Sequence, residues 1–254
     1  MGEETGLLDY LERGGKLSSP DNAPPRYRAE LMRQMASFVD SELAGAAGFA
    51  DCINKGPGIA ERIAAARIVL EKLDHAGRVL KIMGEFGANI DRYETVHPWA
   101  ARIGRDDDIG ARRQGSDMRL NVFHYPLAGW TDAVAMNVLM GAATVIQLGE
   151  LSRGSYQPLA EVFAAILPRE QRHAELGAEG LAKIARAGPG AVDEISRSVD
   201  YWRPRVAATF GGATSSRFDL LRKFGLRHAS NEALRAAWSA DVDATLARIA
   251  ASAA

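Results

Sequence analysis

The sequence predicts an all-α fold, in which long helices form an antiparallel bundle. Apolar residues recur every three to four positions over several segments, as they do on the buried face of a helix. No segment alternates apolar and polar residues in the way of a half-buried strand, and no repeat of about 34 or 40 residues indicates a superhelical array. Expected helices of about 20 to 30 residues therefore favour a bundle.

The chain begins with a segment that serine and proline separate from the first helical pattern. Ser18-Ser19-Pro20 and Pro24-Pro25 are clusters of residues that stop regular structure. We therefore expect residues 1–24 to form a flexible N-terminal arm and residues 25–254 to form a single domain.

Helical spacing defines the first elements of that domain. A helix is expected to begin at Arg26 and to end near Gly45 or Gly48, and a second helix is expected over residues 59–86. Residues 88–125 lack sustained periodicity, so we expect irregular structure with short helical pieces there.

The second half of the chain is helical to its end. The segment 130–151 is apolar nearly all round, which is typical of a helix at the centre of a bundle. Ser155 can cap the helix that follows, and Pro168 should kink that helix about halfway along. That helix is expected to run through Ile184, and the remaining expected helices cover residues 192–210, 216–224 and 231–250.

Composition and charge exclude several classes of protein. The chain has 31 Lys and Arg against 32 Asp and Glu, so no global field attracts nucleic acid or an anionic membrane. The longest apolar stretch, 133–149, is short and polar for a membrane span, and the acidic N-terminal residues are unlike a signal peptide. Cys52 is the one cysteine, which fits a reducing compartment. We expect a cytoplasmic protein that binds neither nucleic acid nor membrane.

A metal-binding pattern is the main chemical signal in the chain. Nucleotide-binding glycine motifs, serine nucleophile elbows and paired cysteines are all absent from the sequence. Glu170 and His173 stand three positions apart on an expected helix, so both side chains can face one metal ion. The same spacing also occurs by chance in solvated helices, which is the simpler interpretation of this pair alone.

Two further residues strengthen the pattern. Carboxylate-bridged di-iron bundles place a Glu on one helix and E-x-x-H on the next, and then repeat both elements. Glu42 and His75 stand at positions that suit the first half of this pattern, with Glu170 and His173 in the second half. Together these four side chains are candidate metal ligands.

The pattern lacks two of its carboxylates. Lys72 stands three residues before His75, where a Glu would complete the motif, and Gly141 stands at the depth of the other missing carboxylate. Lys72 has two interpretations: an ammonium that takes the place of a metal and pairs with Glu42 and Glu170, or a catalytic amine with a lowered pKa. Glu71, Asp74 and Asn137 are poorer substitute ligands, since Glu71 and Asp74 project away from the site and Asn137 is neutral.

Several motifs resemble a known family. Over roughly residues 22–250, the chain resembles the ferritin-like subunits of the phenylacetyl-CoA 1,2-epoxidase (phenylacetic acid catabolic protein) family, and the catalytic subunit more than the structural one. One insertion, near residues 95–118, departs from the family's pattern. The motifs that carry the resemblance occur in order: Arg33-Gln34-Met35, Ser41-Glu42-Leu43-Ala44-Gly45, Asp74-His75, Tyr125-Pro126, Trp130-Thr131-Asp132, Arg153-Gly154-Ser155-Tyr156-Gln157-Pro158, Glu170-Gln171-Arg172-His173 and Ser230-Asn231-Glu232-Ala233-Leu234-Arg235.

The resemblance implies a ferritin-like bundle with additional C-terminal helices, a di-iron centre that uses dioxygen, and an aromatic acyl-CoA substrate. It also implies a reductase and a paralogous partner subunit. Glu42, His75, Glu170 and His173 match the iron ligands of the family, while Lys72 replaces a bridging glutamate and Gly141 replaces an aspartate.

Three functions remain open from the sequence. The first is a divergent, structural subunit with a degenerate iron site, which assembles with itself or with a paralogous ferritin-like subunit. The second is an oxygenase or other enzyme that uses one metal ion, or Lys72, on an aromatic or acyl-CoA substrate. The third is a protein that binds acyl-CoA without chemistry, for which the basic segment 203–227 could supply phosphate contacts.

Overall fold

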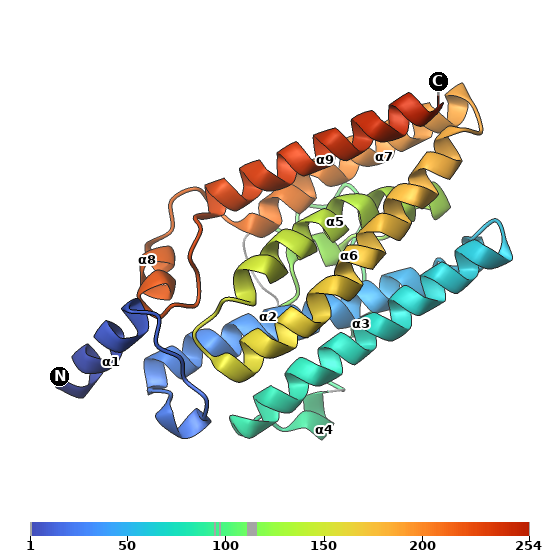
Figure 1. The fold of residues 1–254 in the computed structure, drawn as a ribbon. Coiled ribbons are helices and arrows are strands. Elements are labelled where there is room, and N and C mark those ends of the chain that lie inside the picture. Colours follow the sequence, from blue (N-terminus) through green and yellow to red (C-terminus); the bar gives the residue numbers. More distant parts are fainter. Residues whose placement is uncertain (1, 94, 97, 111–115, 254) are drawn as a thin grey trace.

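The computed structural model describes residues 2–93, 95–96, 98–110 and 116–253. Regular structure in this part of the chain is helical, apart from one isolated bridge between Leu17 and Tyr156. The expected all-α class is therefore confirmed. Long helices lie side by side as a bundle (Figure 1); its members are α2 (Pro25–Ala50), α3 (Ile59–Glu85), α5 (Trp130–Leu151) and α6 (Gln157–Ala185).

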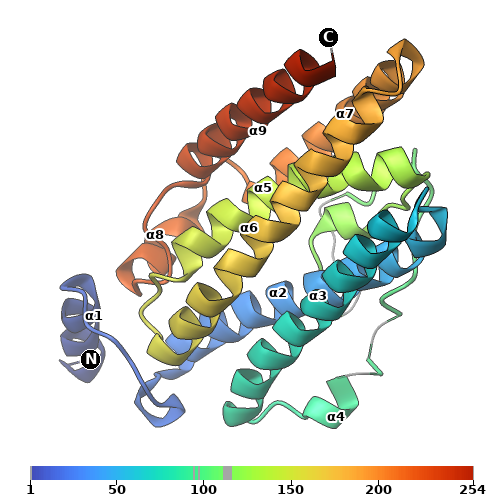
Figure 2. The ribbon, with the colours of Figure 1, turned by 45° about the vertical axis from the view of Figure 1, so that its right-hand side comes forward.

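The four helices form two hairpins that pack against each other. Helix α2 packs on α3, α5 packs on α6, and α3 also contacts α6, as both views show (Figures 1 and 2). Short connections join the helices within each hairpin, and the 3-10 turn η2 (Ile53–Lys55) lies in the first of them. A long crossover joins α3 to α5, which is the connectivity of ferritin-like folds.

The crossover is irregular with short helical pieces, as expected. It contains α4 (Ile90–Tyr93) and the 3-10 turn η3 (Asn121–His124). The buried guanidinium of Arg119 holds this segment together, since it pairs with Asp117 at 2.8 Å and also donates to backbone carbonyls. A buried charge needs such partners, because it has left the solvation of water.

Helix α5 lies at the centre of the molecule. It is long and apolar enough to cross a membrane by length and composition, but 67% of its most apolar 18-residue stretch is buried within the protein. It contacts α6 on one side and α7 (Pro189–Ala207) and α9 (Asn231–Ala253) on the other. This arrangement explains why its sequence is apolar nearly all round.

The additional C-terminal helices cover one side of the bundle. Helices α7 and α9 run along α5 and α6, and α8 (Ser216–Lys223) lies near α1 at one end (Figures 1 and 2). The helix expected over 192–210 is divided into α7 and the 3-10 turn η4 (Ala208–Phe210), after which Gly211 has a φ of 84°. A positive φ is easily adopted only by glycine, so the chain turns here.

The N-terminal segment, residues 2–24 of the described part, has helical structure and contacts the bundle. It contains α1 (Gly2–Glu12) and the 3-10 turn η1 (Pro20–Asn22), and Leu11 and Leu17 are buried in the main core. Backbone hydrogen bonds of 2.8 Å join Leu17 to Ser155 and Gln157. Apolar side chains and backbone pairing therefore attach the segment to the bundle, although proline does interrupt its regular structure.

Ser155 does not cap α6, contrary to our expectation. Its hydroxyl donates to the carbonyl of Phe224 at 2.5 Å and lies 2.8 Å from the hydroxyl of Tyr27. The residue preceding α6 is Tyr156, which makes no side-chain cap. Ser155 instead links the start of α6 to the end of α8 and to α2.

Candidate functional site

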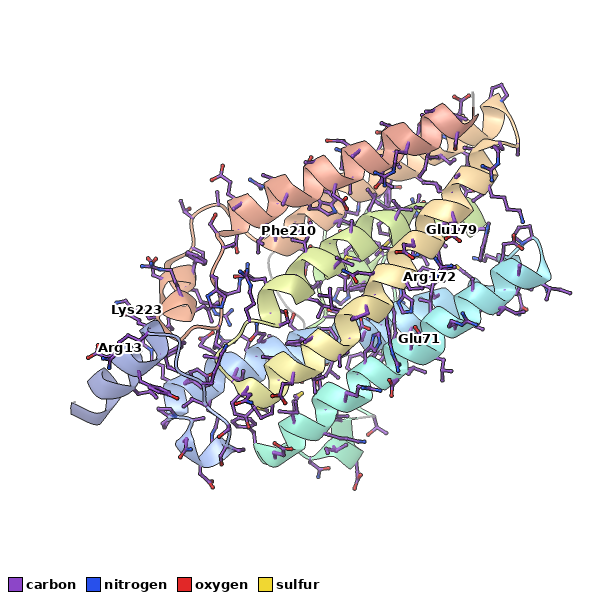
Figure 3. The ribbon with its side chains drawn as sticks, viewed as in Figure 1. Arg13, Glu71, Arg172, Glu179, Phe210 and Lys223 are labelled. Carbon is purple, nitrogen blue, oxygen red and sulfur yellow. The ribbon has the colours of Figure 1, made fainter. Side chains whose placement is uncertain are left out.

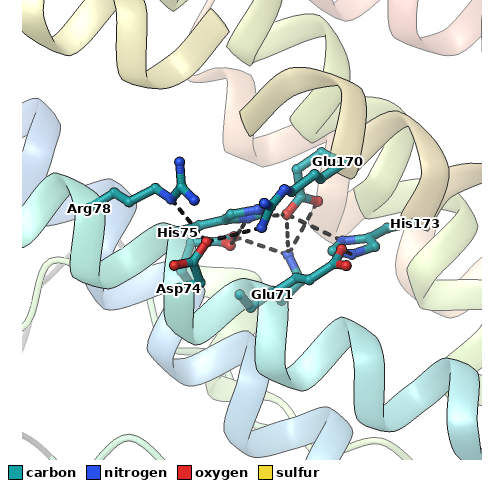
Figure 4. A network of polar contacts seen from close by, with 9 residues as sticks. Glu71, Asp74, His75, Arg78, Glu170 and His173 are labelled. Carbon is teal, nitrogen blue, oxygen red and sulfur yellow. Dashed lines mark hydrogen bonds and ion pairs between the residues drawn. The ribbon is translucent and has the colours of Figure 1, made fainter. Parts of the chain in front are cut away.

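Five predicted residues meet at the centre of the four-helix bundle. Glu42 comes from α2, Lys72 and His75 come from α3, and Glu170 and His173 come from α6. Residues three apart on a helix share one face, so α3 and α6 each direct a pair of side chains toward the bundle axis. All five are buried, with His75 fully so, and Figure 4 shows the resulting network.

Lys72 lies between the two central carboxylates. Its Nζ is 3.0 Å from Oε1 of Glu42, and 3.2 and 3.4 Å from the two carboxylate oxygens of Glu170. The ammonium therefore pairs with both carboxylates at once, as the first interpretation of Lys72 predicted. A buried carboxylate without such a partner would be costly.

The two histidines extend the network on either side of Glu170. Nδ1 of His75 is 3.0 Å from Oε1 of Glu170 and 3.4 Å from Oε2 of Glu42. Nδ1 of His173 is 3.4 Å from the same oxygen of Glu170. Nε2 of His75 is buried and makes no hydrogen bond to the described residues.

Glu71 belongs to the network, which the sequence reasoning did not anticipate. Its Oε2 lies 2.6 Å from Nε2 of His173, and Figure 3 labels Glu71 on α3 where this helix faces α6. We expected Glu71 to project away, but its long side chain crosses the α3–α6 contact. Asp74 does lie outside, where it pairs with Arg78 and Arg169 near the surface.

These contacts set the charges in the cluster. Burial alone would lower the pKa of Lys72, but Glu170 and Glu42 outweigh it and raise that pKa above its ordinary value. Burial alone would raise the pKa of Glu170, but the charge of Lys72 and hydrogen bonds with His173 and His75 hold it well below its ordinary value. Lys72 is therefore an ammonium, whereas a base or Schiff-base nucleophile needs a lowered pKa. The geometry does not favour the interpretation of Lys72 as a catalytic amine.

His75 is also affected by its neighbours. Burial alone would lower its pKa, but hydrogen bonds with Glu170 and Glu42 outweigh burial and raise the pKa. Since these partners are carboxylates, they stabilise the protonated imidazolium relative to the neutral ring.

The position of the other missing carboxylate is closed by packing. A Cβ atom at Gly141 would lie 3.1 Å from Cβ and 3.2 Å from Cα of Ala174 on α6. Asn137, one turn earlier on α5, donates to the backbone carbonyl of His173 at 3.0 Å. Neither position therefore offers a carboxylate to the cluster.

A single metal ion fits the donor atoms better than a pair does. One ligand atom each from Glu42, His75 and Glu170 lie within 4.8 Å of one another, which is close enough to hold one ion. Nζ of Lys72 occupies the same space, however, and two carboxylate positions of a two-metal site are Lys72 and Gly141. A di-iron centre does not fit the residues present.

Two cavities border the cluster. A cavity of about 380 Å³ lies between α2, α5 and the segment from η4 to α8, and Glu42 lines its buried end. A smaller one, of about 30 Å³, is lined by Lys72, Glu170 and mostly apolar side chains. Phe123 and Met140 line both cavities, so the ion cluster lies beside a largely apolar space.

The basic segment 203–227 does not form one cationic patch. Arg203 pairs with Asp243 on α9, while Arg205 stacks on the ring of Tyr201. Arg217 pairs with Glu30 on α2. The segment therefore distributes these three arginines over several parts of the molecule.

Comparison with known proteins gives a consistent result. The sequence profile of the family described as "Phenylacetic acid catabolic protein" matches residues 13–253. A curated relative, one of the subunits of the 1,2-phenylacetyl-CoA epoxidase of Escherichia coli (strain K12), is 22% identical over 207 residues. These residues cover 81% of this chain and 62% of the relative, so the chain spans less than two thirds of that relative's length.

Proposed function

This chain belongs to the phenylacetic acid catabolic protein family, and we propose that it is a divergent ferritin-like member whose central site is held by an ammonium instead of metal. In this proposal it acts as a structural, non-catalytic subunit in the catabolism of aromatic acyl-CoA compounds. The observation that carries the proposal is the position of Lys72 Nζ between Glu42 and Glu170.

Electrostatics support this function over that of a di-iron oxygenase. The ammonium offsets one of the two negative charges of Glu42 and Glu170, which would otherwise attract a divalent ion. A divalent ion about 4 Å from that ammonium would be repelled by roughly 8 kcal/mol at an effective dielectric constant of about 20. The close approach of Gly141 to Ala174 adds a steric reason, because no carboxylate can extend from this position without movement of α5 or α6.

The proposed role in an assembly rests on the relative. The Escherichia coli protein is named as one subunit of an epoxidase, so its name describes one component of a larger complex. We propose that this chain likewise assembles, with a second copy or with a paralogous ferritin-like subunit, in the cytoplasm. Light scattering on the purified chain distinguishes the two, since only self-association gives a multiple of its mass.

A second function is favoured by the donor atoms themselves. If the side chain of Lys72 moved away, Glu42, His75 and Glu170 would form a site for one metal ion. An enzyme with this mononuclear site would keep an open coordination position for substrate or dioxygen. In such an enzyme, the side chain of Lys72 would have to leave its position between Glu42 and Glu170 before the metal ion could bind.

Thermal unfolding in the presence of Fe(II) under anaerobic conditions tests the proposal. The experiment compares the parent with two variants, Lys72→Ala and the double variant Lys72→Ala/His75→Ala. We expect no metal-dependent change in Tm for the parent, because Lys72 blocks the site. For Lys72→Ala we expect an increase of roughly 5–10 °C at Fe(II) concentrations about 100 times Kd, since a ligand stabilises the state that binds it.

The double variant is the control for specific binding. It lacks both the ammonium and an imidazole ligand, so it should lose the increase. An equal increase in the parent and in Lys72→Ala would contradict the proposal and would favour the mononuclear site.

A further inference from the structure

The larger cavity has a largely apolar interior and is lined by three arginines and two glutamates. Its volume of about 380 Å³ lies within the range of pockets that hold small organic ligands. Phe210, labelled in Figure 3 between α9 and α5, packs against Trp238 and lines this cavity. Other apolar side chains continue the wall, among them Phe38, Phe123, Met140, Leu148 and Phe218.

The outer part of the cavity carries excess positive charge. Arg33 on α2 and Arg217 on α8 both pair with the same carboxylate, that of Glu30, at 3.2 and 2.7 Å. Both arginine side chains are 40 to 50% exposed, at 47% and 42%, so they mark the side of the cavity that faces solvent. One carboxylate cannot neutralise two guanidinium groups, which leaves a field that attracts anions.

Arg227 adds a third guanidinium to the cavity wall. Its Nη2 donates to Oδ1 of Asn231 at 3.1 Å, which is a neutral partner. Its Nε is buried and donates to no atom of the described residues. The remaining acid on the wall, Glu42, is already paired with Lys72. Glu150 is an acid near enough to act on Arg227 electrostatically, but its carboxylate is engaged by the backbone N–H groups of His228 and Ala229 and by Arg153. Among the described residues no carboxylate forms an ion pair with Arg227, so a ligand could supply one to the terminal nitrogens of its guanidinium.

We propose that this cavity binds an organic acid, with its carboxylate on Arg227 and its apolar body against the aromatic and aliphatic wall. A guanidinium matches a carboxylate well because both are planar and form two parallel hydrogen bonds. Binding of a free acid goes beyond the proposed function, since it requires neither a metal ion nor a thioester.

Calorimetric titration of the full chain with three octyl compounds tests this inference. Octanoate carries the carboxylate, 1-octanol has nearly the same apolar body without charge, and octanoyl-CoA carries the same body as a thioester. We expect octanoate to bind at least tenfold more tightly than octanol in the parent. Octanoyl-CoA should bind no more tightly than octanoate.

Variants identify the residue responsible. Arg227→Gln should reduce the preference for octanoate over octanol to about onefold. Arg248→Gln, which changes an exposed arginine on α9, should preserve the preference. If Arg227→Gln does not fold, Ser37→Phe, which fills the cavity from α2, should abolish binding of octanoate in a folded protein.

Several affinities measured in this titration would overturn the inference. Equal affinity for octanoate and octanol, or an unchanged preference in Arg227→Gln, removes the role of Arg227. Binding of octanoyl-CoA without binding of octanoate overturns the free-acid site but leaves the proposed link to acyl-CoA catabolism intact. If Arg248→Gln also lost the preference for octanoate over octanol, the inference would be contradicted, because a substitution outside the cavity would then have the same effect as Arg227→Gln.

Discussion

Replacement of Lys72 by methionine should destabilise the protein strongly. Methionine has a similar length and no charge, so the substitution leaves the carboxylates of Glu42 and Glu170 buried without their shared cation. Removal of one partner from a buried ion pair costs about 3–5 kcal/mol. Here Nζ contacts two carboxylates at 3.0 and 3.2 Å, so we expect the upper part of this range.

The effect is large enough for a simple assay. In a protein of this size, each kcal/mol lowers Tm by about 2–4 °C, so a loss of about 4–5 kcal/mol in Lys72→Met should lower Tm by roughly 8–20 °C at pH 7. Differential scanning calorimetry in a chelator-containing buffer measures this directly. Lys81→Met is the matched control, because Lys81 is exposed on the same helix and its substitution should change stability by less than about 0.5 kcal/mol.

A compensating variant separates charge from packing. Lys72→Met combined with Glu42→Gln and Glu170→Gln removes all three charges while it keeps similar side-chain shapes. Replacement of a whole buried ion-pair group is often neutral or stabilising, so this triple variant should recover most of the lost stability. If Lys72→Met is as stable as the parent, or if the triple variant is less stable than Lys72→Met, the ammonium does not hold the site as we infer.

Three further predictions concern other parts of the fold. Gly141→Asp should cost about 1–3 kcal/mol in urea unfolding, because its Cβ would lie 3.1 Å from Ala174; an unchanged midpoint would show that α5 and α6 separate easily. Glu150→Gln should cost on the order of 1–3 kcal/mol at pH 7, since backbone N–H groups of His228 and Ala229 donate to this buried carboxylate. Although burial alone would raise the pKa of Glu150, those hydrogen bonds and Arg153 lower it. Its contribution is therefore present above the ordinary pKa of 4.5 and is lost as pH falls through the folded value, so denaturation midpoints of parent and variant should converge in acid. Deletion of residues 1–24 should lower Tm, because Leu11 and Leu17 are buried in the core; an equal Tm would support the expectation of a flexible arm.

Periodicity predicted the bundle well because apolar spacing depends only on local geometry. The bounds of α5 were predicted to the residue, since its sequence is mostly apolar and is followed by a polar turn. The N-terminal segment was predicted less well, because a backbone bridge to Tyr156 and burial of Leu17 are contacts between distant parts of the chain. Local sequence propensities describe neighbouring residues only, so they cannot predict contacts between distant parts of the chain.

The candidate site was predicted in composition but not in all of its geometry. Spacing of three residues brought Lys72 and Glu170 to the right helix faces, and the structure places them within hydrogen-bonding distance. Glu71 was missed because a helical angle describes the Cβ direction and not the reach of a long side chain. Arg227 was predicted only as one cation of the basic segment 203–227, because the lack of a hydrogen-bond partner for its Nε among the described residues depends on the packing around it.

The iron content of the parent protein tests the central claim most directly. The chain is loaded with Fe(II) under anaerobic conditions, desalted and analysed for iron per chain beside His75→Ala. If the ammonium of Lys72 stands in place of metal, both proteins should hold the same small amount of iron, far below one per chain. A parent that retains one or two irons per chain, with loss of that iron in His75→Ala, would contradict the account and restore a metal centre to this site.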